Sequence, residues 1–255
     1  MNFTEKMIDI LANPQLLDSK VSREVHSRDG MYVSDRENHY FSCGREAVTR
    51  IAGLLALNNS ESPSDILDFA CGFGRVARYL RVAFPEANLT TSDLMKDAVD
   101  FVSNEFSAKA HYSVANLGDV QLPGTYDLIW SGSLLTHLNE SQSTELFKFY
   151  SRKLKPNGFA IFTSHGRYVA KRAHQDKWPY NLNKEVFLEL AKTFEAGEFA
   201  YSDYENMKGY GISIIPLPWI ANTIFSDPSI RLISYIERGW DGHQDIIALQ
   251  KKEII

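Results

Sequence analysis

Cysteine is scarce in this sequence, with only Cys43 and Cys71 among 255 residues. So few thiols favour a reducing environment over a disulfide framework, and no cysteine and histidine cluster has zinc-site spacing. No segment reaches the ~20 uninterrupted apolar residues of a membrane-spanning helix. The first twenty residues do not resemble a secretory signal. We therefore expect a cytoplasmic protein with no membrane span.

An excess of positive charge is also missing. The chain carries 27 Lys and Arg residues against 32 Asp and Glu residues, a formal net charge of −5. Because nucleic-acid binding rewards dense positive charge, we expect no nucleic-acid partner. Hydrophobic residues make up 44% of the chain and aromatic residues 12%, without short repeats, which excludes disorder, collagen and coiled coil.

Strand and helix patterns alternate through the central part of the chain. This alternation predicts an α/β fold with a parallel sheet and helices on both faces. The carboxyl ends of parallel strands share one edge of the sheet, where ligands bind. The expected strands are Ile66–Ala70, Asn88–Asp93, Ala110–Ala115, Tyr126–Trp130 and Phe159–Thr163. The expected helices are Thr4–Leu11, Arg45–Leu57, Arg75–Phe84, Lys96–Phe106 and Ser141–Leu154.

The last third of the chain has a different pattern. Two strands joined by a short link, Arg231–Ile236 and Asp245–Leu249, have to be antiparallel. An inserted lid element is expected near residues 198–228, with two strands and a short helix. We expect one domain. It has a leader over residues 1–43, a ligand-binding core over residues 44–166, and a last part over residues 167–255 that holds the insertion and the final two strands.

The most informative segment is the glycine-rich turn of Ile66 to Arg75, ILDFACGFGR. Gly72 and Gly74 permit close backbone approach to a ligand, and the segment fits the G-x-G-x-x-A dinucleotide fingerprint. Asp68 separates the alternatives, because a carboxylate before the turn repels a pyrophosphate and attracts an ammonium or a sulfonium. Another interpretation is that Asp68 is a buried residue capping the turn backbone.

Polar residues also follow the next two expected strands. Asp93 is placed to accept both hydroxyls of a ribose, or else to cap the helix that begins at Lys96. The amide of Asn116 suits the edge of an adenine, although asparagine equally forms turns. Leu94 and Leu117 could sandwich the base.

With these residues the chain resembles the class I S-adenosylmethionine-dependent methyltransferases. The resemblance covers about residues 60–166 and rests on ILDFACGFGR, TTSD, VAN, YDLIWSGSLLTHL and LKPNGFAIFTSHG, in that order. It implies S-adenosylmethionine as cofactor. It also implies a Rossmann-like, seven-stranded, mostly parallel sheet with an antiparallel last strand, in which the final two expected strands are the sixth and seventh.

The resemblance assigns cofactor contacts to individual residues. Two positions depart from the family pattern, because the family usually has glycine at Ala70 and often has aspartate at Asn116. The implied contacts are Asp68, Ala70, Gly72 and Gly74 to the methionine part, Asp93 to the ribose, Leu94, Asn116 and Leu117 to the adenine, and Ser131 as a wall.

Two further segments, HYFSCGREA at residues 39–47 and ERGWDGHQD at residues 237–245, add a finer likeness. They resemble small bacterial methyltransferases associated with cell-surface polysaccharide or secondary-metabolite pathways, which points to a sugar or glycan acceptor. By this analogy the leader folds over the cofactor and brings Tyr40 and Arg45 near its carboxylate.

Methyl transfer to a hydroxyl benefits from a positioned base, and histidine suits that role near neutral pH. His165 follows the fifth expected strand, and His243 lies between the sixth and seventh. Because strands five and seven are neighbours in the family, we expect the two rings within ~12 Å of one another, close to Asp241. His137, after strand four, is a third candidate. No acidic cluster suggests a catalytic metal.

We interpret the chain as an S-adenosylmethionine-dependent methyltransferase acting on a small molecule or glycan, at a hydroxyl oxygen. The alternatives are an NAD(P)-dependent oxidoreductase and a non-catalytic cofactor-binding protein. The sequence leaves open whether the protein forms a homodimer. Some late residues could contact an anionic or sugar acceptor, or else be solvated and core residues. They are Arg167, Lys171, Arg172, Lys177, Trp178, Tyr180, Tyr201, Tyr204, Tyr210 and Trp219.

Overall fold

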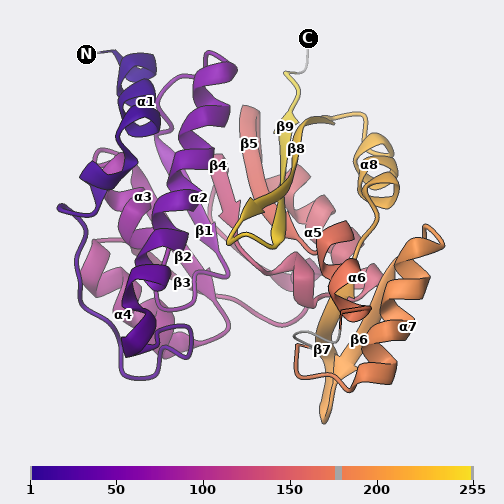
Figure 1. The fold of residues 1–255 in the computed structure, drawn as a ribbon. Coiled ribbons are helices and arrows are strands. Elements are labelled where there is room, and N and C mark those ends of the chain that lie inside the picture. Colours follow the sequence, from indigo (N-terminus) through magenta and orange to yellow (C-terminus); the bar gives the residue numbers. More distant parts are fainter. Residues whose placement is uncertain (1, 176–179, 254–255) are drawn as a thin grey trace. The chain divides into compact units, whose positions relative to one another are not determined.

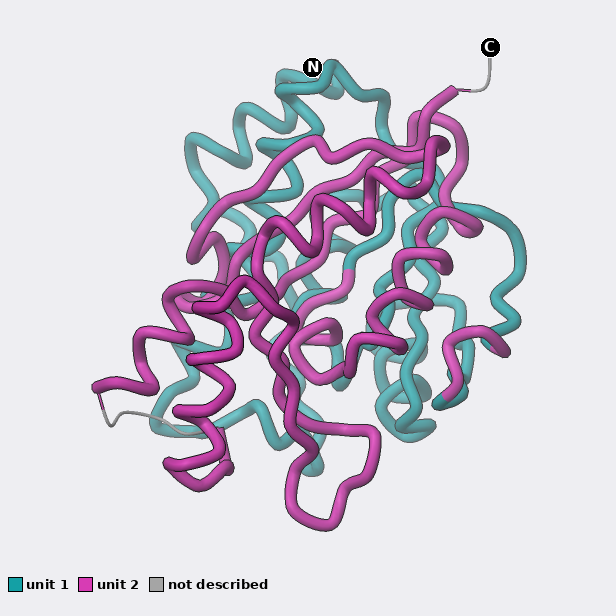
Figure 2. Tube along the Cα trace, turned by 90° about the vertical axis from the view of Figure 1, so that its right-hand side faces the viewer, with its two compact units in different colours: residues 1–115, 120–130 teal, residues 116–119, 131–255 magenta. Residues whose placement is uncertain are grey.

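The computed structural model describes residues 2–175 and 180–253, which divide into two units. Unit 1 takes in Met1–Ala115 and Val120–Trp130, and unit 2 takes in Asn116–Asp119 and Ser131–Ile255 (Figure 2). Lys177 and Trp178 lie outside the described residues. Figure 1 labels the helices and strands of the described chain.

Unit 1 contains four helices and four strands along its described residues. The helices are α1 (Phe3–Ala12), α2 (Glu37–Leu57), α3 (Ala77–Ala83) and α4 (Lys96–Phe106). The strands are β1 (Asp65–Phe69), β2 (Asn88–Asp93), β3 (Lys109–Tyr112) and β4 (Tyr126–Ser131), whose last residue belongs to unit 2. Two short 3-10 helices, Pro14–Leu17 and Ser34–Arg36, lie between α1 and α2.

The strands of unit 1 are parallel. β1 pairs with β2 on one side and with β4 on the other, and β2 pairs with β3. The last four residues of β1 are buried, as in a strand covered on both faces. This places the turn that follows β1 between the carboxyl ends of two neighbouring strands, where the sequence predicts a ligand site.

Helix α2 begins eight residues before the predicted start at Arg45, inside the segment expected to be a leader. Gly44 in its interior obscures the helical pattern. A Cβ at Gly44 would lie 2.2 Å from the carbonyl oxygen of Arg75 and 2.5 Å from the ring of Tyr79. The glycine is therefore needed for the close approach of α2 to the chain around α3.

Unit 2 contains four helices and five strands along its described residues. The helices are α5 (Glu140–Lys153), α6 (Arg167–Ala173), α7 (Lys184–Glu195) and α8 (Leu217–Phe225). The strands are β5 (Leu154–Ser164), β6 (Ala200–Tyr204), β7 (Met207–Ile214), β8 (Ile230–Trp240) and β9 (Gln244–Lys251). Two short 3-10 helices, η3 (Leu117–Asp119) and η4 (Leu135–His137), complete the unit.

The last strand of the chain, β9, is antiparallel to both of its neighbours, β5 and β8. The seven strands follow the order β3-β2-β1-β4-β5-β9-β8. The predicted Rossmann-like sheet, mostly parallel with an antiparallel last strand, is therefore confirmed. So is the expected neighbourhood of the fifth and seventh strands of this sheet, β5 and β9.

A second, two-stranded sheet is formed by β6 and β7 within the predicted insertion. This hairpin shares a hydrophobic core with α6 and α7, so the added module reaches further back along the chain than residue 198. Its buried members include Val169, Ala170, Phe187, Leu190, Ala200, Ile212 and Ile214. The function of a lid stays a prediction, as does the single-domain organisation.

Neither cysteine takes part in a disulfide, as the sequence predicts, and both side chains are buried. Along residues 2–175 and 180–253, no helix combines the length and the apolar character needed to cross a membrane.

Candidate active site

Asp68, the fourth residue of β1, is the chemically exceptional residue of unit 1. Its side chain is only 2% exposed, and its Oδ2 atom has no hydrogen-bond partner among the described residues. Burial, with a smaller contribution from the nearby Asp93 carboxylate, raises the pKa of Asp68 to about 8. The site can therefore accept a cation, which would supply the missing partner and favour the ionised carboxylate.

Several amides of the turn after β1 bond to groups other than Asp68. The amides of Ala70 and Cys71 donate to the carbonyl oxygen of Ser92, at 2.8 and 3.1 Å. The amide of Gly72 donates to Oδ2 of Asp93 at 2.9 Å. These donors give no support to the alternative in which Asp68 caps the turn.

Three residues of the turn have a left-handed backbone, with φ of +65° at Ala70, +50° at Gly72 and +80° at Gly74. A Cβ at Gly72 would meet nothing within 4 Å, whereas one at Gly74 would lie 2.5 Å from the Phe106 ring. Gly72 therefore leaves open space beside the turn, and Gly74 permits packing against α4. Ala70 adopts a conformation that is costly for a residue with a Cβ.

Asp93, the last residue of β2, organises the neighbouring chain. Its Oδ1 accepts a hydrogen bond from the amide of Met95 at 3.0 Å, in addition to the bond from Gly72. The expected alternative, a cap for α4, is wrong, because the residue at the N-cap of α4 is Met95. Leu94 and Met95 are 58% and 45% exposed, so an apolar surface follows the carboxylate.

In unit 2, the rings of His165 and His243 lie 5.8 Å apart between centroids, which confirms their predicted proximity. Asp241 is beside the pair, with its Oδ2 3.9 Å from Nδ1 of His243. The ring of Tyr180 lies 4.9 Å from that of His165. Burial is the main reason that the pKa of His165 is held well below its ordinary value, and His243 and His137 add to the effect.

Hydrogen bonds assign the protons of the three candidate histidines. Nδ1 of His165 lies 3.3 Å from the carbonyl oxygen of Ser213, and Nδ1 of His243 lies 2.7 Å from that of Asp241. Nδ1 of His137 lies 2.8 Å from the carbonyl oxygen of Gly211. Because a carbonyl only accepts, each Nδ1 carries the proton, and each Nε2 of a neutral ring is left as a proton acceptor.

The fold and these motifs agree with comparisons to known proteins. A family model described as a methyltransferase domain matches residues 66–158. A malonyl-[acyl-carrier protein] O-methyltransferase of Acetivibrio thermocellus is 22% identical over 62% of this chain and 54% of its own length. An N-terminal Xaa-Pro-Lys N-methyltransferase 1 of Mus musculus is 29% identical over 40% of this chain and 48% of its own length.

Solved structures show the same fold. The plantazolicin methyltransferase BpumL in complex with SAH has a TM-score of 0.57 at 14% identity, covering 98% of this chain and 99% of that one. A methyltransferase from Clostridium acetobutylicum ATCC 824 has a TM-score of 0.56 at 13% identity, covering 95% and 97%. Taken together, the family-model match over residues 66–158, the curated methyltransferase relatives and the fold support a class I S-adenosylmethionine-dependent methyltransferase. It spans about half the length of the curated relatives it matches.

Two residues that the family likeness places near the cofactor have partners in this methyltransferase fold. The hydroxyl of Tyr40 donates to Asp29 at 2.6 Å and accepts from Arg78 at 3.3 Å. Arg45 forms an ion pair with Asp18. Their predicted contacts with the cofactor carboxylate stay predictions.

The remaining predicted contacts of the methyltransferase motifs lie in unit 2. Asn116 forms a turn, accepting from the amide of Gly118 at 3.2 Å and donating to Asp119 at 2.7 Å, as its alternative interpretation expects. Leu117 and Ser131 are buried. Their contacts with a cofactor stay predictions.

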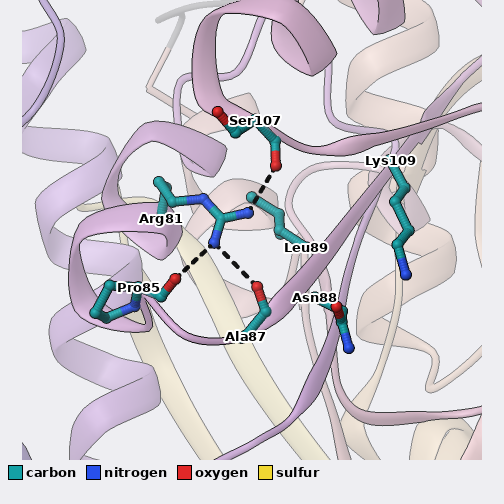
Figure 3. Close-up of a pocket in the computed structure, with 7 residues that line it drawn as sticks. All are labelled: Arg81, Pro85, Ala87, Asn88, Leu89, Ser107 and Lys109. Atoms are coloured by element: carbon teal, nitrogen blue, oxygen red, sulfur yellow. Dashed lines mark hydrogen bonds between the residues drawn. The ribbon is translucent and has the colours of Figure 1, made fainter.

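A cavity of about 450 Å³ in unit 1 lies away from these motifs (Figure 3). It is lined at the amino ends of β2 and β3, whereas the glycine turn follows the carboxyl end of β1. The guanidinium of Arg81 in this cavity donates to the carbonyl oxygens of Phe106, Pro85, Ala87 and Ser107. These bonds make Arg81 a structural clamp of the loops around it.

Sequence reasoning missed Arg78, which the structure places fully inside unit 1 at 1% exposure. It was expected only as part of an amphipathic helix, where arginine ordinarily faces solvent. The one signal available was its position four residues after Gly74, one helical turn beyond the glycine turn.

Proposed function

We propose that the chain binds S-adenosylmethionine at the glycine turn and transfers its methyl group to a small-molecule or glycan acceptor, at a hydroxyl oxygen. The observation that carries the proposal is the buried Oδ2 of Asp68, which has no hydrogen-bond partner in the described chain. A pyrophosphate beside Asp68 would oppose ionisation of the buried carboxyl, whereas the ammonium of the methionine part of the donor favours the carboxylate and supplies its missing partner.

The residues of unit 1 fit such a donor. Asp68 would hold the ammonium, and the open side of Gly72 leaves room for the methionine chain. Asp93, already fixed by two backbone amides, retains acceptor capacity for ribose hydroxyls. The exposed side chains of Leu94 and Met95 would cover an adenine face. When bound, S-adenosylmethionine supplies an activated methyl group on a sulfonium.

The chain's own contribution to the chemistry is alignment and proton removal. A hydroxyl is a poor nucleophile, so a positioned base accelerates its attack. We assign this base to His165 or His243, at Nε2, because Nδ1 of each ring is committed to a backbone carbonyl. The low pKa of His165 keeps its ring neutral, and so able to accept a proton, throughout the neutral range. His137 is oriented in the same way and is a third candidate.

The acceptor has to be identified by experiment, because the relatives include a malonyl-[acyl-carrier protein] O-methyltransferase and an N-terminal Xaa-Pro-Lys N-methyltransferase. The test is transfer of a labelled methyl group to nucleotide-sugars, glycan fragments, malonyl thioesters and amines. We expect label on a hydroxyl acceptor. Label on amines alone would overturn the choice of oxygen. Binding of S-adenosylhomocysteine (SAH) without transfer to any acceptor would favour a non-catalytic protein.

A further inference from the structure

Residues 21–32, here called the strap, lie against both donor motifs of unit 1. The ring of His26 stacks on that of Phe73 in the glycine turn, with centroids 4.6 Å apart and planes 9° from parallel. Arg28 pairs with Asp97 in the first turn of α4, at 2.7 Å. The strap therefore contacts the turn that would hold the methionine part and the helix that follows Asp93.

Arg78 joins the strap to the glycine turn. Its Nε donates to the carbonyl oxygen of Gly74 at 3.1 Å. Its Nη1 donates to the strap carbonyls of Ser22 and Glu24, at 2.9 and 3.0 Å. One planar guanidinium thus fixes the last glycine of the turn and two peptide groups of the strap at once.

A second link runs through Tyr40. Nη2 of Arg78 donates to the hydroxyl of Tyr40 at 3.3 Å, and this hydroxyl donates to Asp29 of the strap at 2.6 Å. Asp29 also accepts from the strap amide of Met31 at 2.9 Å. The buried guanidinium is therefore connected to a carboxylate through one hydroxyl, which compensates a charge that would be costly to bury alone.

The cost of breaking these bonds falls on both segments together. If the strap moved away, Nη1 of Arg78 would lose two acceptors in a site closed by the rings of Tyr40, Phe41 and Phe106, all within 5.3 Å of the guanidinium carbon. A buried donor without an acceptor is unfavourable. A displaced strap would therefore also release the guanidinium from the Gly74 carbonyl and leave that carbonyl with the backbone amide of Arg78, at 3.2 Å, as its remaining donor.

We propose that Arg78 is a positioning residue of the donor site, which holds the strap against the glycine turn and thereby couples strap closure to donor binding. The inference rests on the proposed function, because the glycine turn is where the donor is proposed to bind. Tyr40 and Asp29 act through Arg78 in this scheme. The linkage is reciprocal, so a bound donor stabilises the closed strap as much as the closed strap tightens the donor.

The test compares Arg78→Met with Arg81→Met. Both arginines are on α3, and both bind backbone carbonyls, but Arg81 lies at the amino ends of β2 and β3 (Figure 3). Affinity for SAH is measured by calorimetry, and hydrogen exchange of the strap amides is followed with and without SAH. Tyr40→Phe removes only the bridging hydroxyl and serves if Arg78→Met does not fold.

We expect Arg78→Met to weaken SAH binding about tenfold, and Tyr40→Phe about threefold, while Arg81→Met changes it less than about twofold. SAH should slow strap exchange in the wild type and leave it unchanged in Arg78→Met. Equal losses of SAH affinity in the two arginine variants would overturn this inference alone. So would a rate of hydrogen exchange at the strap amides that SAH does not change in the wild type. Failure of the wild type to bind SAH would overturn the proposed function and, with it, the inference.

Discussion

At the scale of single residues, the ionisation of Asp68 is the central feature. Buried polar groups in folded proteins almost always have a hydrogen-bonding partner, yet Oδ2 of Asp68 has none among the described residues. Such an atom is costly in the ligand-free protein. An ammonium in contact with it would turn that cost into binding free energy.

The first prediction concerns the pH dependence of donor binding. In the free protein the pKa of Asp68 is raised to about 8, so the carboxyl is protonated at pH 6. An ammonium favours the carboxylate, so SAH binding releases a proton, and affinity should rise as pH increases from about 6 to about 8. Calorimetry in buffers of different ionisation enthalpy measures the released proton.

Asp68→Asn should abolish this pH dependence and weaken SAH binding at pH 8. Asp65→Asn is the matched control, because Asp65 is in the same strand but bonds to the side chain of Asn88 at the far end. It should keep both the affinity and the released proton. An affinity that is flat from pH 6 to pH 8 in the wild type would contradict the assignment of Asp68.

The second prediction concerns the base. If His165 accepts the acceptor's proton, His165→Asn should lower kcat by about 10²- to 10⁴-fold, the range typical of general base catalysis, and leave SAH affinity unchanged. Because burial lowers the pKa of His165, wild-type kcat should stay constant to below pH 6.5. His174→Asn, at a histidine bonded to Glu195 on the surface, is the control. If the His165→Asn variant kept the wild-type kcat, the role of the base would be assigned to His243 instead.

At the scale of elements, the third prediction contrasts the two glycines of the turn. Gly72→Ala should weaken SAH binding at least about tenfold, because its methyl would occupy the open side, with a stability loss of roughly 1–2 kcal/mol for the left-handed backbone. Gly74→Ala adds an overlap with Phe106 and Val102 and should cost about 1–3 kcal/mol more. Urea denaturation and calorimetry measure the two effects, and equal stability losses would contradict this difference.

Elements with a clear hydrophobic period could be predicted from the sequence. The bounds of β2 and α4 agree with the prediction residue for residue, and the buried residues of α4, Ala98, Val99, Val102 and Phe106, have helical spacing. The start of α2 could not be predicted, since Gly44 is explained only by its close approach to Arg75 and Tyr79, which are 31 and 35 positions away. β5 begins at Leu154, five residues before its predicted start. The prediction started late because the sequence Pro156-Asn157-Gly158 is typical of a turn.

The candidate site was predictable where a motif is local. Asp68, Gly72 and Asp93 could be singled out because each lies near the carboxyl end of a strand or in the turn that follows it. The proximity of His165 and His243 followed from the order of the strands. Arg78, Tyr40 and Asp29 could not be grouped, because their contact depends on how the chain before α2 returns to α3. Such tertiary contacts have no periodic signal.

At the scale of the whole molecule, the sheet order shows the fold, and we expect the choice of acceptor to depend on the added module. The hairpin of β6 and β7 carries Tyr204 and Tyr210 around His137, with the Tyr210 ring 4.8 Å from that of His137. This local arrangement is specific to the inserted segment. The similarity to solved structures, at 13–14% sequence identity, shows the fold and does not identify an acceptor.

The fourth prediction is a gain in thermal stability. A ligand at about 100 times its Kd stabilises the native state by about 2.7 kcal/mol, and for a chain of this size that corresponds to about 5–10 °C in Tm. SAH should produce this shift in the wild type, and Asp68→Asn should show a smaller one at the same concentration. Scanning calorimetry measures both, and equal shifts would contradict the role of Asp68.

The central claim is that the glycine turn, which follows Asp68 in the sequence, binds a cationic methyl donor rather than a diphosphate. Its most direct test is a parallel calorimetric titration of the wild-type chain with SAH and with NAD. We predict one SAH site per chain, weakened by Asp68→Asn, and no measurable heat with NAD. Tight binding of NAD together with no binding of SAH would contradict the account.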